Sequence, residues 1–103
     1  MRRGTTPTIT FKIKTDLDLN TIDTCYVTFK SLMNGKVKEY DTSTLIIDPE
    51  LKTIEVAMSQ EDTLFLNTGV CKLQIRLKTT DGLAYASDIQ NIDIQPILKE
   101  GVI

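Results

Sequence analysis

Apolar residues in this chain recur at every second position, and this spacing constrains the fold more than any other feature. From Cys71 to Lys78, the odd positions are apolar and the even positions are polar or charged. Ile9, Phe11 and Ile13 repeat the pattern near the N-terminus. Because successive side chains of a β-strand point to opposite faces, the alternation indicates strands with one buried and one solvated face. We therefore predict an all-β chain with antiparallel strand pairing.

Turn-forming residues separate the alternating segments. The pair Asn34-Gly35 favours a two-residue type I′ hairpin, because both residues tolerate the positive φ that this turn requires. Such a turn would place Lys30 opposite Glu39 on the neighbouring strand. In the same register, Phe29 would face Tyr40.

Further turns at Asp48-Pro49-Glu50 and Thr80-Asp81-Gly82 complete the division of the chain. The last apolar segment is irregular, since its apolar residues leave the even positions at Ile89 and then return to them, which predicts a bulge or break between about Ser87 and Asn91. This series of short strands is typical of a β-sandwich or barrel. The seven predicted strands lie near residues 7–14, 23–33, 36–41, 44–48, 52–58, 70–79 and 83–95.

One short helix is predicted after the fifth strand. Ser59 can cap the amides of the next turn, and Glu61 and Asp62 would lie at its positive end. Asn67-Thr68-Gly69 would end the helix. Because a short helix that crosses between two sheets is common at this point in immunoglobulin-like domains, we predict an antiparallel immunoglobulin-like β-sandwich with one helical turn near residues 60–66.

The length of 103 residues fits one domain, which we expect to span residues 1–103. The formal net charge of −2 gives no reason to expect a nucleic-acid partner, so the expected partners are proteins, either other chains or further copies of this one. No apolar stretch follows Arg2 and Arg3, and no run approaches the roughly 20 apolar residues of a membrane span. We therefore expect synthesis in the cytoplasm and no contact with a membrane.

The chain contains no histidine, which removes the usual general base near neutral pH and the commonest metal ligand. Asp16 and Asp18 resemble the start of a calcium-binding loop. Thr21 then stands where that loop requires glycine, and Val27 where it requires glutamate. We therefore expect no enzyme activity, no small-molecule substrate, no cofactor, and no catalytic, cofactor-binding or metal-binding residues.

The two cysteines occupy inward positions of the second and sixth predicted strands. Antibody domains join strands at comparable positions by a disulfide between the sheets, so Cys25 and Cys71 could lie close together. In a reducing cytoplasm we expect both to be reduced thiols, with oxidation as the alternative. A nucleophilic role is not expected, because burial raises the pKa of a thiol.

A basic row and two terminal segments are the candidate contact surfaces. Lys72, Arg76 and Lys78 point outward from one strand, and Lys12 and Lys14 would join them if the strands were neighbours. The row is either a docking surface for an acidic partner or, as the sequence favours, a solvated sheet face.

Residues 1–7 and 96–103 are expected to flank the sandwich as short arms. The second arm carries the apolar Ile97, Leu98, Val102 and Ile103. Chain ends are commonly frayed, but exposed apolar segments often become ordered against a neighbour in an assembly.

Several segments resemble phage proteins. The opening is similar to the start of small prophage-encoded proteins of Firmicutes, in Met1-Arg2-Arg3-Gly4-Thr5-Thr6-Pro7-Thr8 and the following Ile9-Thr10-Phe11-Lys12-Ile13. Four later segments resemble the immunoglobulin-like domain of phage baseplate upper proteins. They are Tyr26-Val27-Thr28-Phe29, Ser59-Gln60-Glu61-Asp62-Thr63, Cys71-Lys72-Leu73-Gln74-Ile75-Arg76 and Thr80-Asp81-Gly82. The resemblance spans nearly the whole chain.

This resemblance implies a non-enzymatic structural component of a phage or prophage tail or baseplate that acts through protein–protein contacts. Such a protein would be made in the cytoplasm of the bacterial host, with incorporation into the virion as a further option. The alternative is a stand-alone binding module for a carbohydrate or a host protein. The sequence disfavours a sugar, because tryptophan is absent and the three tyrosines are scattered, so that no aromatic platform is visible.

Overall fold

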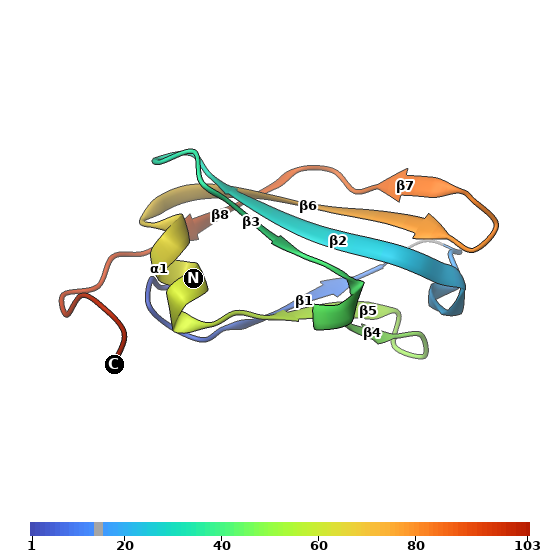
Figure 1. Ribbon diagram of the computed structural model, residues 1–103, viewed down its shortest axis with the longest axis horizontal. Helices are drawn as coiled ribbons and strands as arrows, with labels where there is room; N and C mark the ends of the chain where they lie inside the picture. Colours follow the sequence, from blue (N-terminus) through green and yellow to red (C-terminus); the bar gives the residue numbers. More distant parts are fainter. Residues whose placement is uncertain (14–15) are drawn as a thin grey trace.

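Two antiparallel sheets pack face to face in the computed structural model, which describes residues 1–13 and 16–103 (Figure 1). The smaller sheet has the strand order β1 (Thr8–Lys12), β5 (Thr53–Ala57) and β4 (Ile46–Asp48). The larger sheet has the order β3 (Val37–Tyr40), β2 (Ile22–Ser31), β6 (Gly69–Thr79) and β7 (Ala84–Ala86), with β8 (Gln90–Ile94) also paired to β6.

This topology confirms the predicted all-β sandwich. In immunoglobulin-like sandwiches the strands named C′, C, F and G form one sheet, and B, E and D belong to the sheet that faces it. Here β3, β2 and β6 take the places of C′, C and F, and β7 and β8 together take the place of G. The strands β1, β5 and β4 correspond to B, E and D. Lys14, at the end of the first predicted strand, lies outside the described residues.

The core lies between the two sheets. Odd-numbered side chains of β2 and β6 form one wall, as the alternation predicted, and Ile54 and Val56 of β5 lie in the opposite wall. Leu66, from the helix, and Ile94, from β8, are buried in the same cluster. The remaining buried members are Cys25, Val27, Phe29, Tyr40, Leu45, Met58, Cys71, Leu73, Ile75 and Leu77.

The hairpin between β2 and β3 has a longer loop than the two residues predicted. The Ser31 N–H donates to the Lys36 carbonyl at 2.9 Å, so residues 32–35 form the loop. The glycine of the predicted turn pair does adopt a left-handed φ of 70°. However, the Leu32 N–H donates to the Val70 carbonyl of β6 at 3.0 Å. This bond to a neighbouring strand fixes the first loop residue and accounts for the longer loop.

The longer loop shifts the register of the hairpin. Thr28, and not Lys30, lies opposite Glu39, so the predicted charge pair was wrong. Phe29 and Tyr40 are diagonal neighbours instead of direct partners. Their rings still meet edge to face, with centroids 5.9 Å apart, an arrangement that aromatic pairs prefer.

The predicted helix and the predicted break are both present. The helix α1 (Gln60–Leu66) begins after Ser59, whose hydroxyl oxygen accepts from the Asp62 N–H at 3.2 Å. The break separates β7 from β8, and Ser87 bridges it because its side chain accepts from the Ile75 N–H at 3.0 Å. Two short 3₁₀ turns, η1 (Leu19–Thr21) and η2 (Thr42–Thr44), were not predicted from the sequence.

The first three residues are not a free arm. The Arg3 N–H donates to the Gln95 carbonyl at 3.0 Å, and the Gln95 N–H donates to the Met1 carbonyl at 2.7 Å. This short parallel pairing places the start of the chain beside the end of β8. Residues 96–103 then run past α1 (Figure 1). Within the described part of the chain, no helix has the length and apolar character needed to cross a membrane.

Candidate functional site

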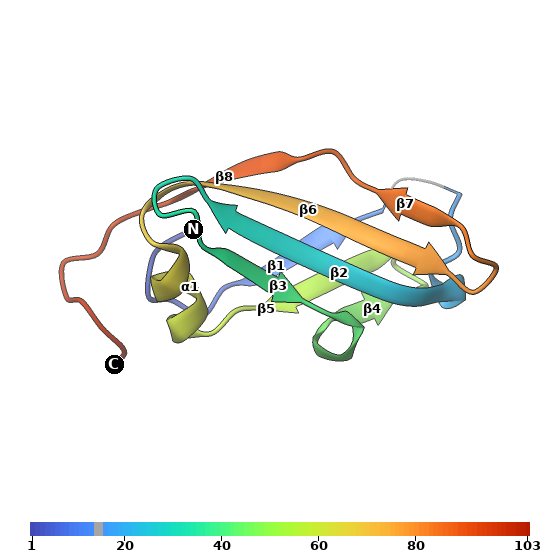
Figure 2. The ribbon, with the colours of Figure 1, turned by 45° about the horizontal axis from the view of Figure 1, so that its top comes forward.

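The outer face of the larger sheet is the strongest candidate site. Because the odd positions from Cys25 to Ser31 of β2 and from Cys71 to Thr79 of β6 are buried, the even positions between them point away from the core. Lys72, Arg76 and Lys78 follow one another along β6, over about 20 Å at 3.3 Å per residue. Lys30 of β2 lies directly opposite Lys72. Figure 2 shows β2 and β6 side by side in the larger sheet, and these two strands carry four cations on their outer face.

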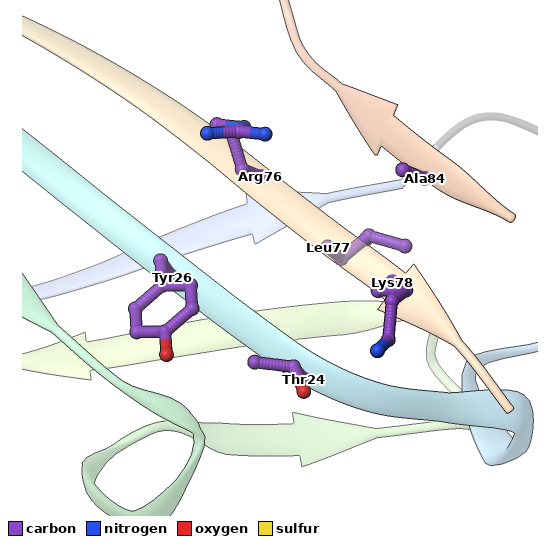
Figure 3. Close-up of a pocket in the computed structure, with 6 residues that line it drawn as sticks. All are labelled: Thr24, Tyr26, Arg76, Leu77, Lys78 and Ala84. Carbon is purple, nitrogen blue, oxygen red and sulfur yellow. The ribbon is translucent and has the colours of Figure 1, made fainter. Parts of the chain in front are cut away.

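A shallow depression of about 230 Å³ lies at one end of this face (Figure 3). Tyr26 and Arg76 are direct cross-strand partners, and Thr24 lies opposite Lys78. On the far side of β6, the small side chain of Ala84 borders the depression. Figure 3 shows the side chains of Tyr26, Arg76 and Lys78 standing on the sheet, with Ala84 leaving the β7 side open. A ligand can therefore approach the sheet closely at this point.

The cations at the centre of the face are not neutralised by the protein itself. Among the described residues, Lys30, Lys72 and Arg76 form no ion pair. Lys78 lies 3.8 Å from the carboxylate of Asp23, but both side chains are about half exposed, at 54% and 52%. Exposed pairs of this kind contribute little stability. The charges of Lys30, Lys72 and Arg76 therefore remain available to a partner.

The extension of this basic row, which the sequence made conditional on neighbouring strands, is not formed by Lys12. Lys12 lies on β1, in the opposite sheet, so it is not a neighbour of the β6 cations. Lys14 is outside the described residues. Tyr26 and the alanines of β7 also belong to this surface, although the sequence did not identify them as parts of it. The even position of Tyr26 was a usable signal, but it required knowing that the second and sixth strands pair.

Cys25 and Cys71 are buried free thiols, as expected, but they do not lie close together, a point that the sequence had left open. Cys25 pairs with Leu77 and Cys71 pairs with Ser31, so about 20 Å of strand separates the two thiols. A disulfide needs Cα atoms within roughly 7 Å of each other. The reason is topological, since β2 and β6 are neighbours in one sheet and do not face each other across the core.

Burial also makes both thiols poor nucleophiles. It raises the pKa of Cys25 to about 11. It raises the pKa of Cys71 as well, against a smaller lowering effect of a hydrogen bond from the Lys30 backbone. Both side chains are therefore protonated at neutral pH, and only a thiolate attacks effectively.

Asp18, in the acidic segment that resembles the start of a calcium loop, has a structural role. The Asp18 carboxylate accepts from the Asn20 N–H at 3.0 Å and caps η1. Within residues 1–13 and 16–103, no group of three or more histidine, cysteine or acidic side chains is arranged to hold a metal ion.

An apolar depression of about 260 Å³ opens between β1 of the smaller sheet and β7 of the larger sheet. Ile13, Leu17, Ile75, Leu77 and Tyr85 contribute to its lining. Tyr85 pairs with Leu77 and so lies on the side of the sheet opposite to the even positions. The exposed tyrosines of β2 and β7 therefore belong to different faces and do not form a shared aromatic platform.

Residues 96–103 form a second exposed surface. The Gln60 side chain holds this segment against α1, because it accepts from the Ile103 N–H at 2.9 Å and donates to the Ile103 carbonyl at 3.3 Å. Glu100 also forms an ion pair with Arg3. The side chains of Leu98 and Ile103 are nevertheless 104% and 89% exposed. The backbone is thus tied to the domain while its apolar side chains lie in solvent.

Comparisons with known proteins found no relative of this chain. The chain matches no protein-family model, and neither the curated proteins nor the solved structures gave a match.

Proposed function

We propose that this chain is a non-enzymatic structural module of a phage or prophage tail or baseplate, and that it acts through protein–protein contacts. The observation that carries the proposal is the segment 96–103, which is held by Gln60 and Arg3 while Leu98 and Ile103 face the solvent. Covering apolar surface is favourable by about 25 cal/mol per Å². An ordered segment that presents such surface is typical of a contact site. The phage setting rests on the sequence resemblance of the opening residues and later strands.

Particle composition tests the phage setting. Particles released after prophage induction are purified, and their proteins are quantified by mass spectrometry. We expect this chain in a fixed stoichiometric ratio to the major tail proteins. Abundant cytoplasmic proteins of the host, measured in the same sample, control for carry-over. If the chain is absent from the particles, or present only at the level of these contaminants, the structural role is wrong.

Side-chain substitution tests the role of the exposed segment. Leu98→Ser with Ile103→Ser keeps both backbone bonds of Ile103 to Gln60 and removes the exposed apolar groups. We expect a lower oligomeric state, or weaker binding to the purified particle proteins, by light scattering after size exclusion. Leu51→Ser is the matched control, because Leu51 is 66% exposed in the turn between β4 and β5. An assembly that the double variant leaves unchanged would exclude this segment as a contact.

A further inference from the structure

The basic outer face of the larger sheet specifies the chemistry of a partner. We propose that it binds an extended acidic segment of a protein, which lies along β6 with its carboxylates over Lys72, Arg76 and Lys78. The inference deepens the proposed function by naming a class of partner, and it concerns a surface distinct from residues 96–103.

The spacing of the cations sets the spacing of the carboxylates. Side chains on one face of a strand recur every second residue, or about every 6.6 Å. Arg76 and Lys78 are one such step apart, and Lys72 and Arg76 are two steps apart, with Gln74 between them. Because an extended partner has the same repeat, acids at alternate positions meet the row in register. The partner position over Gln74 faces no cation, so it can hold either a further acid or another polar residue.

Arg76 lies at the centre of the contact. Its guanidinium is planar and presents several donors in a fork that matches a carboxylate. Tyr26 lies beside it on β2, and the small Ala86 lies beside it on β7. The hydroxyl of Thr24 lines the same depression next to Lys78 (Figure 3). A carboxylate over Arg76 can thus accept charge-assisted hydrogen bonds while the partner backbone packs over the alanines.

The charge arrangement favours an acidic protein over a nucleic acid. Asp23, Glu39 and Asp93 lie at the edges of the face, beside the cationic row. These acids would repel the flanking phosphates of a continuous polyanion. Duplex DNA carries one charge per about 1.7 Å of its axis, which is far denser than cations spaced by about 7 to 13 Å along β6.

The test measures binding of a fluorescent peptide in which glutamate alternates with threonine, by anisotropy at low ionic strength. A peptide of equal composition, with its glutamates in one block, tests the spacing, and a single-stranded DNA of equal charge tests a general polyanion. The variant Lys72→Gln, Arg76→Gln, Lys78→Gln removes the row. The matched control, Lys12→Gln, Lys36→Gln, Lys99→Gln, removes the same charge from other surfaces. Circular dichroism checks that both variants fold.

We expect the alternating peptide to bind the unaltered protein and the control with equal affinity, and the row variant to bind it roughly tenfold more weakly. Amide shifts in an NMR titration should fall on β2, β6 and β7 and spare β1. The proposal is overturned if the unaltered protein does not bind the alternating peptide, if the two variants weaken binding equally, or if the blocked peptide or DNA binds as tightly. None of these outcomes depends on whether the chain is found in phage particles, so the two proposals fail separately.

Discussion

Asp62 is the carboxylate most closely tied into the fold by its neighbours. It accepts from the Tyr40 hydroxyl, its Oδ1 lies 3.3 Å from the Lys38 ammonium, and it accepts from the Ser59 N–H at 3.5 Å. Burial acts to raise the pKa of Asp62, but the hydrogen bonds from Tyr40 and Lys38 outweigh it, and the net pKa is lowered. One side chain therefore joins the start of α1 to β3, a connection that the sequence pattern did not reveal.

This lowered pKa predicts a pH-dependent contribution to stability. Because the folded-state pKa lies below the unfolded value, the contribution is complete above the ordinary aspartate pKa of about 4 and is lost as the pH falls through the folded-state value. Asp62→Asn should lower the free energy of unfolding by about 1 kcal/mol near neutral pH, and the difference should shrink in acid. Denaturant unfolding of the unaltered protein and the variant, near neutral pH and in acid, measures the difference in the free energy of unfolding. Asp93→Asn, which removes an exposed carboxylate at the edge of the larger sheet, controls for the general loss of one negative charge.

The burial of both cysteines leads to a prediction about the reactivity of their thiols. Because burial raises the pKa of Cys25 to about 11 and also raises that of Cys71, neither thiol should react at an appreciable rate with Ellman's reagent in the folded protein. Both should react rapidly once the chain is unfolded. Mild oxidation of the folded monomer should give no intramolecular disulfide, because the residues lie far apart along one sheet. A rapid reaction of either native thiol, or a bridge seen by mass spectrometry, would contradict this placement.

At the scale of the elements, strands with one buried and one solvated face were the most predictable part of the molecule. In β2 and β6 every odd apolar residue faces the core, so their alternation was sufficient to place them. The β2–β3 register was not predictable from the turn pair alone, because a hydrogen bond from Leu32 to Val70 of another strand decides the loop length. Local signals fix an element, whereas contacts between distant segments fix its partners.

The connection between α1 and β6 depends on backbone conformation. Gly69 has a φ of 113°, a region that side-chain-bearing residues avoid. A Cβ at this position would also lie 2.6 Å from Cγ of Met33. We expect Gly69→Ala to lower the free energy of unfolding by about 1–2 kcal/mol, measured by denaturant titration. Gly82→Ala is the matched control, since its φ of 88° is also strained but no atom lies within 4 Å of the added Cβ.

The comparison of the two glycine variants separates backbone strain from crowding. Met33 is 71% exposed and flexible, so it can move away from an added methyl group. The two variants should therefore be destabilised to a similar extent. A much larger loss for Gly69→Ala would mean that Met33 is held rigidly at the tip of the β2–β3 hairpin.

At the scale of the whole molecule, the sandwich was predictable and its surfaces were only partly so. The basic row on β6 could be found from sequence because its three cations share one strand. The residues that flank this row could not be predicted from sequence. Tyr26, Lys30 and Ala84 lie beside it only because β6 pairs with β2 and β7. The same pairing separates Cys25 from Cys71. Membership of a sheet was thus the information that the chain's local pattern lacked.

The pairing of residues 1–3 with the end of β8 has a practical result for anyone who labels or immobilises this protein. It draws the N-terminus to the pole where residues 96–103 run past α1, and the molecule is elongated, with extents of 47 × 23 × 20 Å (Figure 1). A tag on either terminus would therefore crowd that pole. The turn between β4 and β5 lies in the smaller sheet at the opposite end of the molecule, and it offers an attachment point that leaves both residues 96–103 and the basic row free for capture experiments.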